Sequence, residues 1–343
     1  MLIIKKMKVA IITNHYVLSP KQTNIHCIND ILDKNYDIDW FTYPVSISIL
    51  RKRNRYKLYA LIRGFNLQYF IFTPIPKYIL KFNFLRNFLS FEFKCRKVTK
   101  FLYDIVIVEG VQPSYVYSNF NFRKLIVRAS DDLGYLDLFS DEVATYESMV
   151  SNADQVWAVL RSTTKKYENA IYLPNPSIYD HVIQQFNYQK KEAVYVGSNK
   201  CDNQLLIKLA DSGIIINMYT EDCKLKHKNI ILHDIISKKD LALCISEYKV
   251  GLIPFLQNDQ NKYMEIPLKT YDYIAAGLHV VMISSSSEVN TEIIQSASSY
   301  DEFIALVHLN MERGINVEKY NHALQERGVE WFSTCIKKQL SLL

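Results

Sequence analysis

The stretch Pro267-Leu-Lys-Thr-Tyr-Asp-Tyr-Ile-Ala-Ala-Gly-Leu-His-Val280 decides how the second half of this chain folds. Its proline fixes a turn, residues 269–276 suit a short helix, Gly277 suits a left-handed C-cap, and residues 279–283 form an apolar strand. A helix that begins at Lys269 places a cation beside free N–H groups and the positive end of the helix dipole. The stretch therefore predicts an anion site that a diphosphate would fit. An ordinary amphipathic helix between two strands is the alternative, and it does not explain the lysine and the acid together.

The surrounding sequence continues this alternation of strand and helix. It predicts strands at 193–197, 214–219, 229–233 and 250–255, helices at 202–211 and 238–247, and further helices from about 300 to the C-terminus. Strands that alternate with helices are typical of a parallel sheet with crossover helices. We therefore expect residues 177–328 to form one Rossmann-like domain.

The first half of the chain shows the same alternation. Strands are predicted at 7–13, 37–42, 104–109, 125–128, 155–159 and 171–173, with helices at 23–34, 142–151 and 162–169 and a helix start near Pro113. Pro174-Asn-Pro176 breaks the pattern, which predicts a first domain at 1–176. A C-terminal helix is expected at 329–343, and it would cross back to the first domain. The expected fold class is α/β, with two Rossmann-like domains whose parallel sheets face an interdomain cleft. Ligands of such sheets bind at the carboxyl ends of the strands.

Length and composition fit this organisation. The 343 residues are 49% hydrophobic and 22% charged, which is typical of a globular protein with two domains of ordinary size. No apolar run approaches the length of a membrane-spanning helix, and the first residues lead directly into a strand, so we expect a cytoplasmic protein. The six cysteines contain no C-x-x-C pair, which argues against a zinc site or a disulfide scaffold.

Charge is distributed unevenly along the chain. Residues 51–100 contain thirteen Lys or Arg and one acid, Glu92, a net charge of +12, and they also contain twelve aromatic residues. Cations interleaved with aromatic rings suit an anionic membrane surface, which is the interpretation we prefer. A groove for single-stranded nucleic acid uses the same residue types, and a solvated face over an ordinary core is the third explanation.

Two further segments place polar residues after predicted core strands. Gly197, Ser198 and Asn199 follow the strand at 193–197, where a glycine lets the backbone approach a ligand and the polar side chains can bind phosphate or sugar oxygens. Asp131 and Asp132 follow the strand at 125–128 in the first domain. Either carboxylate suits a general base that removes a proton from an acceptor hydroxyl, although either could instead cap the next helix.

The stretch at 267–281 resembles the donor-binding segment of the GT-B nucleotide-sugar glycosyltransferases, P-x-K-x-x-E-Y-x-A-x-G-x-P-V-V. Asp272 stands where that family usually has Glu, and His279 stands where it usually has Pro. The resemblance implies that Leu268, Lys269 and Asp272 bind a nucleotide sugar, with Asp272 on the ribose hydroxyls. The residues in register are Pro267, Lys269, Asp272, Tyr273, Ala275, Gly277, Val280 and Val281.

The segment Arg128 to Leu133 resembles that of membrane-associated inverting members of this group, such as the xanthan glucuronosyltransferase. That resemblance favours Asp132 over Asp131 as the base. Retaining members usually carry a glutamate eight residues before the position of Asp272, where this chain has Met264, so an inverting reaction is favoured. Lys269, the helix N-terminus and Ser198 would neutralise the leaving diphosphate without a metal or other cofactor. Asp37-Ile-Asp39 matches the D-x-D pattern of metal-dependent transferases. It stands at the start of a predicted strand, however, and those transferases have a different architecture.

Asn14 and His15 follow the first strand, and we expect them on the acceptor side, with His15 an alternative base. Glu109 and Gln112 have a similar but weak claim. Together these features predict a cytoplasmic, peripherally membrane-bound glycosyltransferase that moves a sugar from a nucleoside diphosphate, for which we expect UDP, to a lipid-linked saccharide. A uronic acid donor and bacterial surface polysaccharide biosynthesis follow from the resemblance. The alternatives are a nucleic-acid-binding protein and a nucleotide-sugar epimerase of the same fold.

Overall fold

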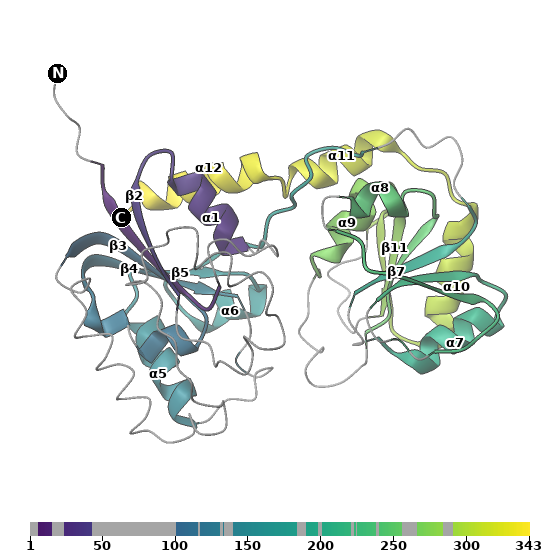
Figure 1. Cartoon of the computed structure of the whole chain (residues 1–343), viewed down its shortest axis with the longest axis horizontal. Helices are drawn as coiled ribbons and strands as arrows, with labels where there is room; N and C mark the ends of the chain where they lie inside the picture. Colours follow the sequence, from purple (N-terminus) through teal and green to yellow (C-terminus); the bar gives the residue numbers. More distant parts are fainter. Residues whose placement is uncertain are drawn as a thin grey trace. The chain divides into compact units, whose positions relative to one another are not determined.

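The computed structural model describes residues 6–15, 24–42, 101–115, 117–130, 133, 140–183, 190–197, 201–220, 223, 225–237, 240–255, 266–283 and 291–343. The chain divides into two compact units (Figure 1). Unit 1 consists of Met1–Pro174 and Cys335–Leu343, and unit 2 consists of Asn175–Thr334. The basic aromatic region at 51–100 lies outside the described residues.

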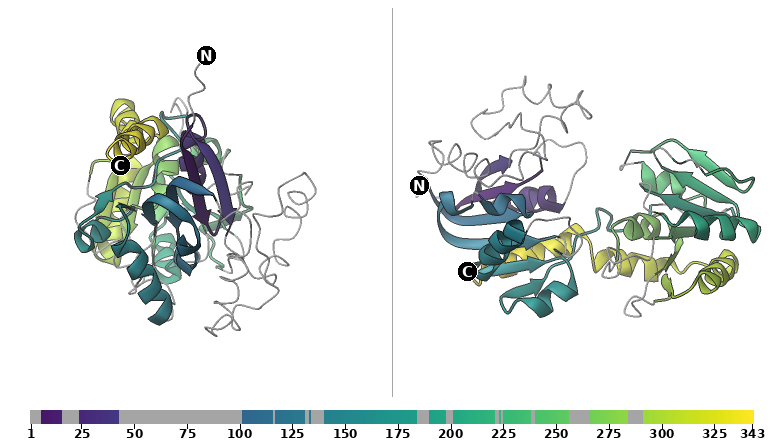
Figure 2. Two further views of the ribbon diagram at one scale, coloured as in Figure 1. Left: turned by 90° about the vertical axis from the view of Figure 1, so that its left-hand side faces the viewer. Right: turned by 90° about the horizontal axis from the view of Figure 1, so that it is seen from below.

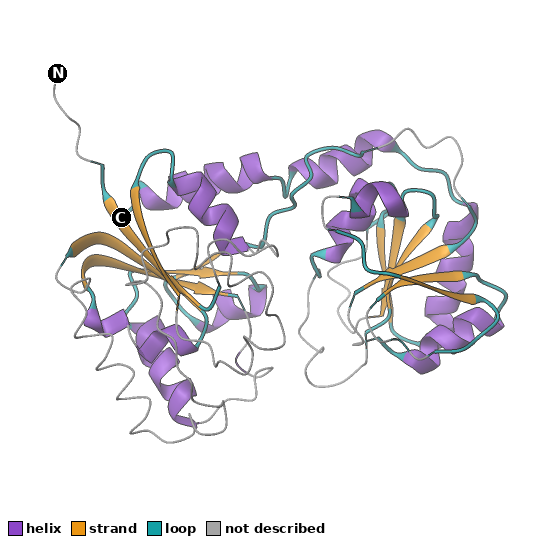
Figure 3. Cartoon of the chain, in the orientation of Figure 1, coloured by secondary structure: helices purple, strands orange, loops and turns teal. Residues whose placement is uncertain are grey.

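Unit 1 contains one parallel sheet with the strand order β2-β1-β3-β4-β5-β6 (Figure 3). Its strands are apolar runs such as Val-Ala-Ile-Ile in the first strand, as a sheet covered on both faces requires. The elements are β1 (Lys8–Thr13), α1 (Asn24–Leu32), β2 (Asp37–Thr42), β3 (Leu102–Glu109), η4 (Gln112–Tyr115), η5 (Tyr117–Asn119), β4 (Asn121–Ala129), α5 (Ser140–Ser151), β5 (Gln155–Ala158), α6 (Arg161–Lys166) and β6 (Ala170–Tyr172).

The two faces of the unit 1 sheet are covered by different helices. Alternate residues of the central strands pack with Tyr146, Met149 and Val150 of α5 in one buried cluster. The opposite face carries α1 and the last helix, α12 (Val329–Leu340) (Figures 1 and 2). Since burying a large aliphatic side chain contributes about 1.5–3 kcal/mol, these two apolar layers stabilise the unit and fix the strand register.

Unit 2 contains a second parallel sheet, with the strand order β12-β11-β10-β7-β8-β9. Its first strand in the chain, β7, therefore lies in the middle, with β10, β11 and β12 on one side and β8 and β9 on the other. The elements are β7 (Ala193–Val196), α7 (Asn203–Asp211), β8 (Ile216–Tyr219), β9 (Ile230–His233), α8 (Leu241–Ile245), β10 (Val250–Ile253), α9 (Lys269–Ala275), β11 (His279–Ile283), β12 (Ile294–Ala297), α10 (Tyr300–Glu312) and α11 (Val317–Gln325).

Two buried clusters sandwich the unit 2 sheet. One joins the strands to α8, α9 and α11, and the other joins them to α7 and α10. The helix ends are capped by short polar side chains, as Asp202, Ser299 and Asn316 accept hydrogen bonds from backbone N–H groups in the first turns of α7, α10 and α11. The helix α12 begins in unit 2 and ends in unit 1, where the Gln155 side-chain amide donates to the carbonyl of Gln339.

The α/β class with two parallel sheets is confirmed, one local prediction is wrong, and one strand was not predicted. The segment at Pro113 forms only the 3-10 turn η4, since its four residues are about one helical turn and cannot form an α-helix of useful length. The strand β12, whose sequence is Ile-Gln-Ser-Ala, was not predicted, since two polar residues hide its pairing with β11. Among the described residues, no helix is both long enough and apolar enough to span a bilayer.

Candidate functional site

Lys269 begins α9, and its ammonium lies among aromatic rings at the carboxyl edge of the unit 2 sheet. The Nζ atom lies 4.6 Å from the centroid of the Tyr195 ring and 4.9 Å from that of the Phe255 ring. A cation over an aromatic face is attracted by the ring quadrupole, by about 0.5–1 kcal/mol when exposed and more when desolvated. Tyr195 belongs to β7 and Phe255 follows β10, so two neighbouring strands fix the position of this cation.

Gly197 follows β7 directly and contacts the same ammonium. Its φ is +147°, and a Cβ built at this position would lie 2.7 Å from Lys269 Nζ and 3.2 Å from the Tyr195 hydroxyl. Any side chain here would displace the cation, so only glycine allows this approach. The structure thus brings Gly197 and Lys269 together. Ser198 and Asn199, which we expect to share the site, lie outside the described residues.

The surroundings of Lys269 alter its titration. Burial lowers the pKa of Lys269 to about 8, although the nearby Cys201 thiol and Asp272 carboxylate favour the charged form. At neutral pH the ammonium is still mostly protonated, but it has lost part of its hydration. A cation in this state gains more from a bound anion than a fully hydrated surface lysine does.

The first turn of α9 offers fewer free backbone donors than we expected. The N–H of Thr270 donates to the carbonyl of Pro267 at 2.9 Å, and the N–H of Tyr271 donates to the carbonyl of Leu268 at 3.1 Å. These tight-turn bonds occupy two of the donors that the sequence argument counted as free. Leu268, which precedes the helix, is 41% exposed. Attraction of an anion therefore depends on the charge of Lys269.

Asp272 is almost completely buried, at 3% exposed. Its carboxylate accepts a hydrogen bond from the Tyr179 hydroxyl, and burial together with this carboxylate raises the pKa of Tyr179. The resemblance assigned Asp272 to the ribose hydroxyls of a donor. In this structure its carboxylate accepts a hydrogen bond from Tyr179, which lies between the two predicted sets of strands.

Tyr273 and Gly251, which had no functional role in the sequence-based prediction, hold this edge of the sheet together. The Tyr273 hydroxyl accepts from the N–H of Val196 at 2.9 Å and donates to the carbonyl of Leu252 at 3.1 Å. Its ring lies against Gly251, where an added Cβ would come within 2.3 Å of the ring. Tyr273 therefore ties α9 to β7 and β10 and positions the backbone just before Gly197. The tyrosine of the motif was its only sequence signal.

A pocket of about 410 Å³ lies farther along the same carboxyl edge, at the ends of β8 and β9. The His233 ring stacks on the Tyr219 ring with centroids 4.5 Å apart, and its Nε2 lies 2.8 Å from Oδ1 of Asn217. These contacts hold His233 at the wall of the pocket. The lining residues are Thr220, Cys223, Leu232, His233 and Asp234.

In unit 1 the corresponding carboxyl edge gathers polar groups around one buried carboxylate, Glu109. Thr13 Oγ1 donates to Oε2 of Glu109 at 3.1 Å, and Ser130 Oγ donates to Oε1 at 2.9 Å. His15 Nε2 lies 3.8 Å from Oε2 of Glu109, and the His15 N–H donates to Thr13 Oγ1 at 3.2 Å. Three neighbouring strands, β1, β3 and β4, thus supply this cluster.

Arg128 lies beside this cluster and is fully buried, with its Nη1 donating to the carbonyl of Leu173 at 2.5 Å. Burial lowers the pKa of Arg128 to about 10, whereas the Glu109 carboxylate favours its charged form. The register pairs Glu109 with Arg128 across β3 and β4. A buried carboxylate therefore sits next to a buried guanidinium, an arrangement in which each charge depends on the other.

The acceptor-side candidates Asn14 and His15 lie at this edge. The Asn14 side chain lies close to Gly110, where an added Cβ would be 3.1 Å from Nδ2. The backbone carbonyl of His15 accepts from Trp40 Nε1 at 3.1 Å, which fixes the loop after β1. Asp131 and Asp132 follow Ser130 in the chain and lie outside the described residues. Glu109, to which we gave little weight, is the best-defined acid of this edge.

Two further observations complete the description. Among the described residues, no group of three or more His, Cys, Asp or Glu is arranged to hold a metal ion. His279, which replaces the usual proline of the motif, bonds through Nε2 to the Gly314 carbonyl at 3.2 Å and through Nδ1 to the Tyr320 hydroxyl at 3.1 Å. Both of its ring nitrogens are occupied, so His279 links β11 to α11 rather than binding a ligand.

No protein-family model matches the sequence, and no curated protein sequence matches it. Comparison with solved structures shows similarity over nearly the whole chain. Sucrose-phosphate synthase from Thermosynechococcus elongatus is 10% identical, with 98% of this chain and 99% of that chain covered and a TM-score of 0.66. HepE from Anabaena, solved in complex with UDP, is 9% identical over 98% and 100% of the two chains, with a TM-score of 0.63.

A third similar structure is the UDP-GlcNAc 2-epimerase from Methanocaldococcus jannaschii. It is 12% identical over 98% of this chain and 100% of that chain, with a TM-score of 0.57. At these identities the likeness concerns the fold. Together with the two parallel six-stranded sheets, it shows that the chain has the GT-B fold.

Proposed function

We propose that the protein is a nucleotide-sugar-dependent glycosyltransferase that uses a UDP-linked sugar. The observation that carries this proposal is the position of Lys269, whose half-buried ammonium lies against Gly197 and between two aromatic rings at the carboxyl edge of the unit 2 sheet. A GT-B neighbour was solved with UDP, which supports the same choice of ligand. A desolvated cation beside a side-chain-free backbone turn suits a diphosphate.

On the donor side, Lys269 would bind the diphosphate, and the loop of Gly197, Ser198 and Asn199 would approach it with backbone and side-chain donors. The pocket at the ends of β8 and β9 offers space for the uracil ring of the nucleotide. A ribose role for Asp272 requires its carboxylate to exchange Tyr179 for the sugar hydroxyls. In this proposal Lys269 neutralises the leaving diphosphate, and the reaction needs neither a metal nor another cofactor.

On the acceptor side, Asp132 would act as the general base, with Asp131 beside it. The acceptor hydroxyl oxygen attacks the anomeric carbon as its proton passes to the carboxylate, and the bond from that carbon to the diphosphate oxygen breaks. Attack opposite the leaving group inverts the anomeric configuration. Asn14 and His15 would contact the acceptor from the loop after β1.

The proposed acceptor is a lipid-linked saccharide at the inner face of the plasma membrane, as in bacterial surface polysaccharide biosynthesis. The basic aromatic region at 51–100 would hold unit 1 at the anionic surface of that membrane. This pattern and the resemblance to membrane-associated inverting enzymes such as the xanthan glucuronosyltransferase support the proposal. The resemblance also favours a uronic acid as the transferred sugar.

A nucleotide-sugar epimerase is the second candidate, because a GT-B neighbour is a UDP-GlcNAc 2-epimerase. The two functions differ in their products. An epimerase converts the free nucleotide sugar to an isomer without an acceptor, whereas a transferase releases the nucleoside diphosphate and extends the acceptor. A nucleic-acid-binding protein would bind oligonucleotides in a salt-sensitive manner and would not bind nucleotide sugars.

The test is a two-step assay with purified protein. A panel of nucleotide sugars is first screened for thermal stabilisation, and we expect one or more UDP-linked sugars to raise the melting temperature. The stabilising compounds are then incubated with and without polyprenyl-linked saccharides, and the release of UDP and the products are followed. Release of UDP that depends on the acceptor supports a transferase. Isomerised nucleotide sugar without an acceptor, or stabilisation by no nucleotide sugar, would overturn the proposal.

A further inference from the structure

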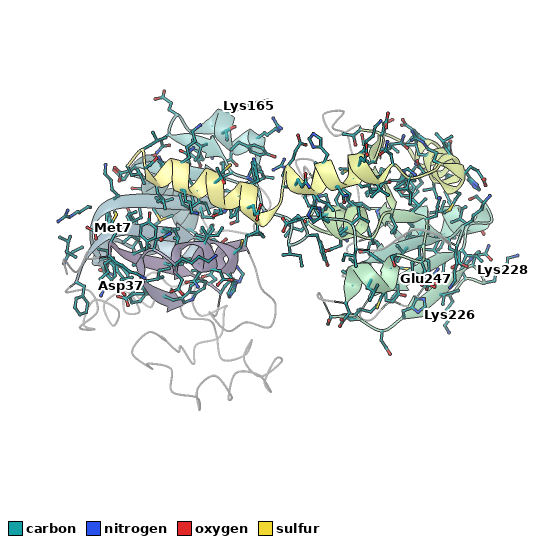
Figure 4. The ribbon with its side chains drawn as sticks, turned by 90° about the horizontal axis from the view of Figure 1, so that it is seen from above. Met7, Asp37, Lys165, Lys226, Lys228 and Glu247 are labelled. Carbon is teal, nitrogen blue, oxygen red and sulfur yellow. The ribbon has the colours of Figure 1, made fainter. Side chains whose placement is uncertain are left out.

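One histidine at the carboxyl edge of the unit 2 sheet bonds to the rest of the described chain through only one of its ring nitrogens. His233 ends β9, the outer strand of that sheet, which follows Lys228 at the margin of unit 2 (Figure 4). Its Nε2 lies 2.8 Å from Oδ1 of Asn217, whereas its Nδ1 has no hydrogen-bond partner among the described residues. His279 differs, since both of its ring nitrogens are bonded to the protein. His233 therefore has one nitrogen to offer to the pocket that it lines.

A carboxylate determines which nitrogen of His233 carries the proton. The side-chain amide of Asn217 donates through Nδ2 to Oε2 of Glu192 at 2.8 Å. An ionised carboxylate only accepts, so the amide oxygen of Asn217 must face His233, and Nε2 of His233 must donate to it. In a neutral imidazole the other nitrogen is then an acceptor. The bonds from Glu192 through Asn217 thus make Nδ1 of His233 an acceptor.

Packing holds the imidazole ring of His233 in this orientation. Asn217 is buried, and Tyr219, two residues later on β8, stacks on the ring with centroids 4.5 Å apart and planes 13° apart. The hydroxyl of Tyr219 lies 3.0 Å from that of Tyr248, which fixes the supporting ring in turn. The register places Tyr219, not Asn217, directly opposite His233. Because Asn217 lies nearer the amino end of the strands, a ring with Nε2 at Asn217 turns Nδ1 towards the carboxyl end, where the pocket lies.

We propose that Nδ1 of His233 accepts a hydrogen bond from the imide N–H of uracil and so selects uracil over cytosine. The inference rests on the proposed function, because it concerns the nucleotide whose diphosphate lies at Lys269. Uracil carries a ring N–H between two carbonyls, and this N–H matches an acceptor. Cytosine has an unprotonated nitrogen at the same place, so two acceptors would face each other. His233 then determines the specificity for the base, and Glu192 and Asn217 are positioning residues.

The position of the pocket along the sheet suits one nucleotide. Gly197, beside the ammonium of Lys269, follows β7, and β9 is the second strand from β7 in the sheet. Neighbouring strands lie about 4.8 Å apart, so the end of β9 is roughly 10 Å from the end of β7. The ribose of an extended nucleotide bridges such a distance between its diphosphate and its base.

A solely structural role for His233 explains fewer of these observations. Stacking on Tyr219 and a bond to Asn217 would hold any histidine in place, but they do not require the second nitrogen to be left at the wall of a pocket. Asp234 also lines the pocket, and its carboxylate likewise only accepts. It therefore supplies no donor for the ring nitrogen of cytosine.

The experiment compares the binding of UDP and CDP to the full chain by calorimetry, because the two nucleotides differ only at this edge of the pyrimidine ring. We expect UDP to bind about tenfold or more tightly, since an acceptor left facing an acceptor forfeits roughly that factor. His233→Phe keeps a ring for stacking but has no acceptor, so the preference should fall to within about threefold. His308→Phe is the matched control, because His308 lies on α10 and bonds to Ser212. It should keep the full preference.

The positioning role of Glu192 has a readout of its own. Glu192→Gln replaces the carboxylate with an amide that also donates, so the Asn217 amide can turn over and the proton of His233 is no longer fixed. We expect the preference for UDP over CDP to fall in this variant. Nitrogen NMR of the histidine-labelled full chain measures the tautomer directly. The His233 signal is assigned by its loss in His233→Phe, and it should show the proton on Nε2 in the unaltered chain and on either nitrogen in Glu192→Gln.

The outcomes distinguish this inference from the proposed function. If UDP binds and Lys269→Met weakens that binding, but His233→Phe keeps the full preference, the inference is overturned and the proposed function stands. If neither nucleotide binds, both are overturned. A proton on Nδ1 of His233 in the unaltered chain would overturn the inference even if His233→Phe failed to fold. So would loss of the preference in Asp234→Asn but not in His233→Phe, because the neighbouring carboxylate would then recognise the base.

Discussion

The carboxyl edges of the two sheets carry opposite charges on the same scaffold. Unit 1 gathers a buried carboxylate, Glu109, with hydroxyl donors from β1 and β4. Unit 2 gathers a half-buried ammonium, Lys269, with aromatic rings from β7 and the segment after β10. Both sheets have six parallel strands, so the difference comes from the few residues that follow the strands.

This difference shows how a repeated architecture supports unlike chemistry. A carboxylate with hydroxyl donors suits the alcohol side of a transfer reaction, and an ammonium beside a glycine turn suits the phosphate side. The carboxylate of Glu109 accepts hydrogen bonds from two hydroxyl groups, whereas the ammonium of Lys269 lies against ring faces and donates no side-chain hydrogen bond to any other described residue. The two edges therefore differ in how their charged groups are satisfied, by hydroxyl donors in unit 1 and by ring faces in unit 2.

The contrast between the two edges fails most completely if unit 1 supplies no general base. We expect Asp132→Asn to lower transfer on the order of 10³-fold, because the amide cannot accept the acceptor proton, while UDP binding is unchanged. Transfer is measured by UDP release with acceptor present, and binding by calorimetry. Asp131→Asn is the matched control and should retain most activity. Near-normal turnover of Asp132→Asn would reject it as the base, and loss in Asp131→Asn alone would move the role to that residue.

The buried charges of unit 1 provide the next largest effect. Glu109→Gln leaves the fully buried Arg128 without its neighbouring carboxylate, so we expect the free energy of unfolding to fall by about 3 kcal/mol. Denaturant unfolding measures this change. Glu312→Gln removes a carboxylate paired with Lys191 on the exposed surface and should cost less than about 1 kcal/mol. Similar losses in both variants would show that the charge of Glu109 does not stabilise the buried Arg128.

The cation of unit 2 gives a smaller effect on binding. We expect Lys269→Met to weaken UDP binding roughly tenfold or more, since a charge-assisted bond contributes about 1.5–3 kcal/mol. It should not lower the free energy of unfolding, because it removes a cation whose pKa burial has lowered. Calorimetry and thermal unfolding measure the two quantities. Lys249→Met is the control, because burial also lowers the pKa of Lys249 but that residue lies outside the candidate site.

The pH dependence of UDP binding tests the same residue independently. Because the pKa of Lys269 is about 8 in the free protein, its positive charge is lost as pH rises through that value. Affinity for UDP should therefore fall between pH 7 and pH 9 in the unaltered chain and stay flat in Lys269→Met. If the affinity of the unaltered chain for UDP did not change with pH, the diphosphate would not bind at Lys269.

Much of the fold was predictable from the sequence because its strands are apolar runs with punctuated ends. The strand β2 at Asp37–Thr42 matches its predicted range, and the helix α12 at Val329–Leu340 begins at the predicted residue and ends three residues earlier than predicted. β12 was missed because its pairing with β11 is a tertiary fact that a short, half-polar segment does not reveal. Sequence pattern reports burial along the chain and says little about edges of sheets.

The candidate site was predictable only where topology sufficed. Gly197 and Lys269 had to share one edge because both adjoin carboxyl ends of the same parallel sheet. The bond from Tyr179 to Asp272 was not predictable, since Tyr179 lies in a segment with no strand or helix pattern. The cluster at Glu109 was undervalued because its partners Thr13 and Ser130 come from separate strands. The roles of the site residues in binding and catalysis stay predictions.

The smallest expected effect separates the two units by their response to acid. His279 of unit 2 is buried between the Gly314 carbonyl and the Tyr320 hydroxyl, and burial lowers the pKa of His279 from 6.5 to about 4. The unfolded chain therefore takes up a proton below about pH 6.5 that the folded chain refuses, so stability is lost as pH falls from there towards 4.

At pH 5.5 the loss should be about 1.4 kcal/mol relative to neutral pH, since one pKa unit corresponds to about 1.36 kcal/mol. Calorimetric unfolding of the full chain at pH 7 and pH 5.5 measures it, and the change should appear in the transition that UDP binding shifts. His279→Gln keeps a polar group between β11 and α11 but cannot titrate, so it should lower stability at pH 7 and reduce the acid sensitivity of that transition. Equal acid sensitivity in the variant and the unaltered chain would assign the loss to other groups, and the contrast between the units would then rest on Glu109 and Lys269 alone.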